Sequence, residues 1–202
     1  MLTPWQLINS TDGMLVRVIN GFKALCTQTY DEMNKKRGLQ WAASRLITDA
    51  PTSTGAINST GVYYSILRTG DKPVDLKSRE FAHTGTGIVA DIFENPVYTG
   101  GTLDPLYNAC GIAETTPTVD LLTGFTLTDE GVKFAPTVYV LGPTSQQSRG
   151  APNALYGSNY ILAANTSYLL KFYSADTQLQ DIAVRIEFYD GGLDVPNEDI
   201  PT

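Results

Sequence analysis

The sequence predicts a mainly β protein: an antiparallel β-sandwich, jelly-roll-like, with an N-terminal arm and hairpin. The clearest evidence lies near the C-terminus, where Tyr168, Leu170 and Phe172 occupy every second position of an extended segment. In the following segment, 181–189, apolar residues again alternate, and Arg185 and Glu187 fall on the other face. Because side chains alternate across a strand, the pattern of each segment indicates a strand with one buried and one solvent-exposed face. We expect these two strands to form an antiparallel pair.

The composition agrees with this class. A chain of 202 residues suits one domain with an arm, and 18 Gly, 11 Pro and 11 Tyr with only 17% charged residues are typical of a turn-rich β protein found in assemblies. The net charge of −7 disfavours DNA or RNA as a main partner, because an acidic surface repels phosphate. No apolar run is long enough for a membrane span and no signal peptide is evident, so we expect synthesis in a cytoplasm.

The N-terminal elements are ambiguous in one place. Residues 1–12 are expected to be irregular. The stretch 14–27 contains two apolar runs around Asn20-Gly21, a strong hairpin signal because both turn residues need positive φ. Its apolar residues also fit a helical spacing, but Gly21 inside a helix would cost about 1 kcal/mol, so we favour the hairpin. A short helical turn is expected over 30–37, ended by Gly38.

After a loop at 48–61, short strands recur between turn signals, as in a sandwich. We expect strands at 62–67, 74–76, 79–82, 88–93, 124–128, 133–141, 160–163, 167–173 and 181–189. Two Gly-containing segments, 85–87 and 129–131, are interpreted as hairpin turns. Residues 142–159 form a long polar loop. The resulting organisation is an arm and hairpin at 1–45, a sandwich at 46–192 and an acidic tail at 193–202.

The sequence offers little chemistry. His83 is the single histidine, which rules out a site with two histidine ligands, and we expect it at the polar rim of a strand end. Asp91 and Glu94 are three apart on a strand, so they should lie on opposite faces and cannot act as a catalytic pair. The acidic residues from Asp190 onwards are interpreted as a solvated tail rather than a calcium site. We therefore expect no enzymatic activity, no catalytic residue, no cofactor and no metal.

Two other sets of residues leave their roles open. Exposed aromatic residues can stack on sugars or pack against a protein partner, and the candidates for partner contact are Trp5, Tyr98, Tyr107 and Tyr156. The two cysteines, Cys26 and Cys110, are most simply free thiols in a reducing cytosol, although the sequence also allows a disulfide between them.

The order of several segments resembles a family of small β-sandwich proteins found in the virions of tailed bacteriophages. The matching segments are GLQWAAS (38–44), YSILRTGDKPVDLKSR (64–79), ADIFENPVYTGGT (90–102), PLYN (105–108), YILAANTSYLLKF (160–172) and EFYDG (187–191). The resemblance spans 38–191 and is carried by the order of the segments rather than by one motif. The chain departs from the family after Asn108, where family members continue with basic residues.

The resemblance implies a virion protein made in the host cytoplasm, with no catalytic residues to transfer. The expected role is capsid decoration: a cement protein that docks on shell subunits and stabilises the head. Its partners would be the major capsid protein or other virion proteins and further copies of itself, without nucleic acid or membrane. The alternative is a tail, baseplate or fibre component that binds host glycans. A glycan hydrolase is the least favoured interpretation.

Overall fold

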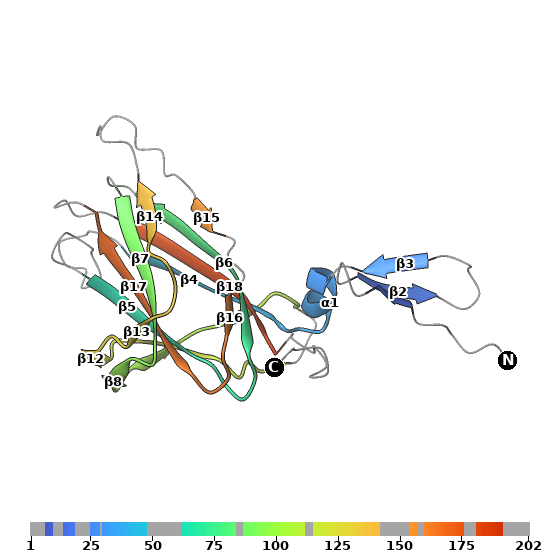
Figure 1. Ribbon diagram of the computed structural model, residues 1–202, viewed down its shortest axis with the longest axis horizontal. Helices are drawn as coiled ribbons and strands as arrows, with labels where there is room; N and C mark the ends of the chain where they lie inside the picture. The colour runs from blue at the N-terminus through green and yellow to red at the C-terminus, as the bar shows by residue number, and fades with distance from the viewer. Residues whose placement is uncertain are drawn as a thin grey trace.

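Two antiparallel sheets lie face to face and enclose the main core, and a smaller sheet stands apart from them (Figure 1). The structure, a computed structural model, describes residues 7–9, 14–18, 25–28, 30–47, 62–83, 87–111, 115–141, 154–156, 160–175 and 181–191. The side chains of 7–9, 14–18, 25–28, 30, 47, 62–63, 141 and 154–156 are not described. The segment 48–61 therefore lies outside the described residues, as does the tail 193–202.

The described residues form one helix and eighteen strands. The helix is α1 (Tyr30–Lys36). The strands are β1 (Leu7–Asn9), β2 (Met14–Val18), β3 (Leu25–Gln28), β4 (Gln40–Ile47), β5 (Val62–Arg68), β6 (Val74–His83), β7 (Gly87–Glu94), β8 (Val97–Thr99), β9 (Thr102–Asp104), β10 (Tyr107–Asn108), β11 (Asp120–Thr123), β12 (Thr126–Asp129), β13 (Val132–Lys133), β14 (Val138–Leu141), β15 (Ala154–Tyr156), β16 (Tyr160–Leu162), β17 (Ser167–Ser174) and β18 (Ile182–Asp190).

The strand order of the two large sheets is that of a jelly roll. The six-stranded β18 sheet has the order β10-β4-β18-β6-β15, with β16 also on β6, and the seven-stranded β17 sheet has the order β13-β7-β17-β5-β11-β9, with β14 also on β7. Along the chain the principal strands are β4, β5, β6, β7, β14, β16, β17 and β18. The first, eighth, third and sixth form one sheet, and the second, seventh, fourth and fifth form the other, which is the double Greek-key arrangement. The sandwich class predicted from the sequence is confirmed.

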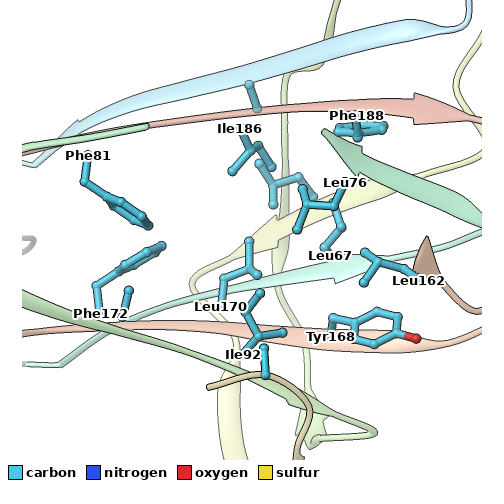
Figure 2. Close-up of a cluster of buried hydrophobic side chains, with 14 of the residues drawn as sticks. Leu67, Leu76, Phe81, Ile92, Leu162, Tyr168, Leu170, Phe172, Ile186 and Phe188 are labelled. Atoms are coloured by element: carbon cyan, nitrogen blue, oxygen red, sulfur yellow. The ribbon is translucent and has the colours of Figure 1, made fainter. Parts of the chain in front are cut away.

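The expected pairing of the last two strands is wrong. β17 pairs with β5 and β7, whereas β18 pairs with β4 and β6. The two strands lie in opposite sheets, and their apolar residues meet across the core (Figure 2). The buried residues that they contribute to this core are Tyr168, Leu170, Phe172, Ile182, Ile186 and Phe188. The alternation therefore identified the buried face correctly but not the pairing partner.

The two expected hairpin turns also connect strands that do not pair. β6, which ends at His83, and β7, which begins at Gly87, belong to different sheets. β12 and β13, on either side of 129–131, pair with β8 and β7 respectively. Gly131 has φ +82°, and a Cβ there would lie 2.2 Å from the carbonyl oxygen of Glu94. A glycine is required at this position because the backbone comes so close to β7.

β6 is one strand where the sequence predicted two, and a β-bulge explains the difference. Leu76 pairs with Phe188 and Ser78 pairs with Glu187, so the backbone of Lys77 has no partner in the register with β18. Val74 and Leu76 face the core before the bulge, and Phe81 faces it afterwards. The extra residue reverses the alternation, because two residues on the bulged strand oppose one on its neighbour. β16 pairs before the bulge and β15 pairs after it.

The N-terminal region contains the expected hairpin and helix. In the arm sheet, of order β1-β2-β3, Val18 pairs with Leu25, so the hairpin is confirmed and the helical alternative for 14–27 is wrong. A two-residue turn at Asn20-Gly21 would pair Val18 with Lys23, so the observed register differs from the one that this turn predicts. Residues 7–9, expected to be irregular, form β1.

The helix ends as predicted, and the sandwich begins earlier than expected. Gly38, at φ 74°, follows α1. The amides of Gly38 and Leu39 donate to the carbonyls of Lys35 and Asn34, which is a Schellman cap. β4 pairs with β18, so the sandwich begins at Gln40 rather than at the expected boundary after residue 45.

Candidate interaction surfaces

The four aromatic residues proposed for partner contact have different surroundings. Trp5 lies outside the described residues, and Tyr156 is in β15, where side chains are not described. Tyr98 is half-buried: its ring packs edge-on against Phe125, with centroids 5.6 Å apart. It covers a small apolar cluster on the outer face of the β17 sheet. Tyr107 is 62% exposed and therefore remains a candidate for partner contact.

Tyr107 belongs to an edge where the chain passes from one sheet to the other. β9 pairs with β11 in the β17 sheet, and β10 pairs with β4 in the β18 sheet. We call β9, β10 and the adjoining strand β4 the crossover edge. Two further large apolar side chains are exposed on it, Leu46 at 65% and Leu103 at 61%. Neither residue is among the candidates that the sequence suggested. The proline that follows Thr102-Leu103-Asp104 was the available signal, since proline is confined to the edges of sheets.

A cleft opens between the sheets at the crossover edge. Its volume is about 240 Å³, and its lining includes Ala43, Ser65, Leu121, Leu170, Phe172 and Ile186. Ala43 and Ser65 are small, so the space between the facing sheets is not filled there. Arg45 and Asp104 also line the cleft and form an ion pair at 2.7 Å. The volume lies below the roughly 300–1,000 Å³ of pockets that hold drug-sized ligands. The cleft therefore offers apolar contact on the scale of a side chain.

The outer face of the β17 sheet carries a network of charges. The Lys133 ammonium lies 2.9 Å from Asp91, and the Thr137 hydroxyl donates to Asp91 at 2.7 Å. Lys171 pairs with Glu130 at 2.8 Å. Burial alone would lower the pKa of Lys171, but the hydrogen bond and charge of Glu130 raise it overall. These ion pairs tie the turn around β13 to the sheet.

The two carboxylates considered as a pair lie on opposite faces of β7, as expected. Asp91 belongs to the outer network. Glu94 accepts a hydrogen bond from the Tyr168 hydroxyl at 3.1 Å, and the Tyr168 ring is part of the core. The two groups therefore do not converge on one substrate.

Another polar cluster lies between α1 and the β18 sheet. The Tyr189 hydroxyl donates to Asp31 at 2.8 Å and accepts from Lys77, the bulge residue, at 2.7 Å. Lys77 also pairs with Asp31 at 2.7 Å. Burial raises the pKa of Tyr189 to about 12, so the phenol stays neutral. Burial would raise the pKa of Asp31 as well, but hydrogen bonds from Lys77 and Tyr189 lower it overall. The bulge thus supplies the cation that holds α1 on the sheet.

Asp75, opposite Tyr189 in the register, is buried, and its Oδ1 has no hydrogen-bond partner among the described residues. Burial raises its pKa above the ordinary 3.8, and the charge of Asp31 raises it further. The folded state therefore binds this proton more tightly than the unfolded state, and the stability it contributes is lost as pH rises through the raised pKa. We expect Asp75→Asn to raise the free energy of unfolding at neutral pH by about 1 kcal/mol.

This gain in the free energy of unfolding should disappear in acid below the ordinary aspartate pKa, where Asp75 is protonated in both the folded and the unfolded state. Urea unfolding at neutral pH and at such an acidic pH measures the gain. Asp71→Asn, in the exposed turn before β6, changes the net charge equally and should have no such effect. A gain for Asp75→Asn that is equal at both pH values would contradict the assignment.

The remaining sequence candidates are structural. His83 is 3% exposed and pairs in register with the core residue Ile182, so the expected rim position is wrong. The bulge reverses the alternation of β6, and His83 therefore falls on the face that packs against the core. Cys110 is a free thiol and is therefore not bonded to Cys26. Asp190 is buried and accepts from the amide and hydroxyl of Thr118, so it is not part of a solvated tail. Within the described residues no group of His, Cys, Asp and Glu is arranged to hold a metal. None of the described helices has the length and apolar character to cross a bilayer.

Comparisons with known proteins identify no family. No protein-family model matches the chain, and no curated protein matches it. Among solved structures, a chain from the T=1 particles derived from infectious bursal virus aligns with 91% of this chain and 47% of its own length, at 15% identity. The chain thus corresponds to less than half of that protein, and the TM-score of 0.17 is too low to carry an argument about fold or function.

Proposed function

We propose that the protein is a structural component of a tailed-bacteriophage virion, and specifically a capsid decoration protein that docks on the shell. The observation that carries the proposal is the arm. β2 and β3 stand beyond α1, clear of the sandwich (Figure 1). A sheet held away from the body of its own chain is placed to contact neighbouring subunits. The exposed apolar residues Leu46, Leu103 and Tyr107 give the sandwich further points of contact.

The proposed mechanism is stabilisation by added buried area. A protein that binds only the assembled shell stabilises that state by mass action, in the same way that a ligand stabilises the state it binds. A stable contact buries about 1,200–2,000 Å² in total, which requires the arm and part of the sandwich together. Jelly rolls occur in viral capsids and in lectins, so the fold supports this role only by analogy. In this role the protein performs no reaction and needs no cofactor.

The test is the heat stability of particles with and without the protein. Particles that lack it should release DNA at a lower temperature, and adding the purified full-length chain should restore the release temperature. A chain that lacks the arm, beginning at residue 30, should bind more weakly and restore less. The variant Val132→Asp, changed at an exposed position on the far edge of the β17 sheet, should restore the release temperature fully. Equal tolerance to heat and salt with and without the protein would refute the proposal.

A fibre or baseplate protein that binds host glycans is the second candidate. It is favoured by the aromatic residues on the outer face of the β17 sheet, where Tyr139 is 61% exposed and the ionic network lies close by. Sugar rings stack on such aromatic faces while carboxylates accept from their hydroxyls. Binding to a glycan array that is abolished by Tyr139→Ala would favour this role over decoration.

A further inference from the structure

Strand β4 is incompletely paired on the side away from β18. β18 pairs with β4 along its whole length, Gln40–Ile47, whereas β10 pairs only with Trp41 and Ala42. The chain before β10 crosses to the other sheet, where Asp104 pairs with β11. Within the described residues no other strand lies on this side of β4. We call residues 43–47 on this side the free edge of β4.

The backbone groups of alternate residues on the free edge point away from β18. The carbonyl of Leu39 accepts from the last amide of β18, and the carbonyl of Gln40 accepts from the amide that follows β10. Successive residues of a strand direct their backbone groups to opposite sides, so Ser44 and Leu46 direct theirs to the same side as Gln40. β10 does not extend to these two residues. Their N–H and C=O groups therefore have no strand partner among the described residues, and such an edge is a template for a further strand.

The cleft opens beside this edge, and its lining is apolar and without net charge. Leu170, Phe172 and Ile186 reach it from the two facing sheets (Figure 2). The charged residues of the lining, Arg45 and Asp104, form an ion pair with each other. A charged side chain placed in the cleft would therefore be buried without a partner, whereas an uncharged apolar side chain matches the lining. The cleft and the free edge together present an apolar space next to unpaired backbone groups.

We propose that this site binds an extended, uncharged segment of another virion protein. The segment pairs as a strand with the free edge of β4 and places one apolar side chain in the cleft. Strand addition of this kind takes its affinity from backbone hydrogen bonds and its specificity from pockets for alternate side chains. A small apolar molecule or a helix would not fit both parts of the site, because neither offers free backbone donors and acceptors to Ser44 and Leu46. The inference rests on the proposed function and deepens it, since it names the kind of segment that the sandwich binds.

The small size of the site sets the expected size of the effects. A short strand and one side chain bury less than the roughly 1,200 Å² of a stable interface. The site therefore acts together with the contact proposed for the arm, and several weak contacts on one surface reinforce each other through effective concentration. Loss of the site should weaken binding to the shell without abolishing it.

The first experiment measures binding of the purified full-length chain to particles that lack it, by co-sedimentation. Ala43 lines the cleft, so Ala43→Leu should fill the cleft from within and weaken binding about tenfold. Its melting temperature should not fall, because the new side chain occupies empty space. A fall in that temperature would make the backbone variants below the deciding ones.

A proline at the free edge tests the backbone contact separately. Leu46→Pro removes one N–H that points away from β18 and leaves the pairing with β18 intact, since proline is tolerated at sheet edges. Leu46→Ala is the matched control, because it removes the same exposed side chain and keeps the N–H. Leu46→Pro should bind the particles about tenfold more weakly than Leu46→Ala.

Hydrogen exchange shows whether a strand has been added. In the free protein the amides of Ser44 and Leu46 should exchange rapidly, whereas those of Ala43 and Arg45, which face β18, should exchange slowly. Binding to particles should slow exchange at Ser44 and Leu46.

The possible outcomes separate this inference from the proposed function. A wild type that does not bind the particles would refute the proposed function and the inference with it. Wild-type binding that Ala43→Leu leaves unchanged, with Leu46→Pro equal to Leu46→Ala, would refute the inference alone. Slow exchange at Ser44 and Leu46 without particles would also overturn it, because the edge would then be covered by the same chain or, if the effect rises with concentration, by a second copy.

Discussion

Replacing Phe172 by alanine should lower the free energy of unfolding by about 3–5 kcal/mol. Phe172 lies in β17 and is 5% exposed. Its ring meets Phe81 of β6 edge to face, with centroids 5.6 Å apart, so the pair joins the two sheets across the core (Figure 2). Aromatic pairs of this geometry are worth about 0.5–1.5 kcal/mol beyond the area they bury. The change removes both the pair and the largest side chain that lines the cleft, so the cleft should widen towards the core.

Urea unfolding followed by tryptophan fluorescence measures this loss, because Trp41 is buried in the same core. Phe172→Leu keeps most of the volume and should cost less than about 1.5 kcal/mol. Tyr139→Ala removes an exposed aromatic residue from the same sheet and should stay within about 0.5 kcal/mol of the wild type. A loss for Phe172→Ala as small as that for Tyr139→Ala would mean that the sheets are not packed through this pair.

These residues show what sequence patterns can reveal about the fold. Alternation at 168–172 and 182–188 identified the core correctly, because burial of every second residue is a local consequence of the strand conformation. It could not assign partners, because pairing depends on how the whole chain winds. In a jelly roll, strands that follow one another in sequence usually lie in opposite sheets. The hairpin interpretation of 85–87 failed for the same reason.

The interaction surfaces were harder to predict than the core. Tyr107 was identified, but Leu46 and Leu103 were not, since an exposed leucine has the same local pattern as a buried one. β4 was missed as a strand because its buried face uses the small Ala43 beside Trp41. Tyr98 was expected at a contact, yet the structure packs it on Phe125, an arrangement that only the pairing of β8 with β12 brings about. Exposure is a tertiary property, and no local pattern records it.

Two single-residue deletions should have opposite outcomes. Deleting Lys77 removes the bulge of β6, so that Leu76 and Ser78 pair with Phe188 and Glu187 in an unbroken ladder. All core residues of β6 keep their faces. The protein should therefore fold, with a loss of about 1–3 kcal/mol for the missing hydrogen bonds to Asp31 and Tyr189.

Deleting Lys171 should prevent folding. β17 pairs without a register shift on both sides, with Lys171 opposite Tyr64 and Asp91. A shift of one residue turns every following side chain to the other face of the sheet. Phe172 would leave the core and Tyr173 would enter it, in a strand that is central to its sheet. The expected cost exceeds the total stability of about 5–15 kcal/mol that is usual for a domain, because both neighbouring ladders are disrupted.

The two deletions are well matched, since each removes one lysine that forms an ion pair in a central strand. Near-ultraviolet circular dichroism and a thermal melt distinguish the outcomes: a cooperative transition for the deletion of Lys77 and none for the deletion of Lys171. The difference between them arises only from register, because the lost charge and side-chain volume are the same. Unfolding of the Lys77 deletion would show that the bulge is not where the alternation of β6 reverses. A native-like melt of the Lys171 deletion would show that the register of β17 does not decide folding.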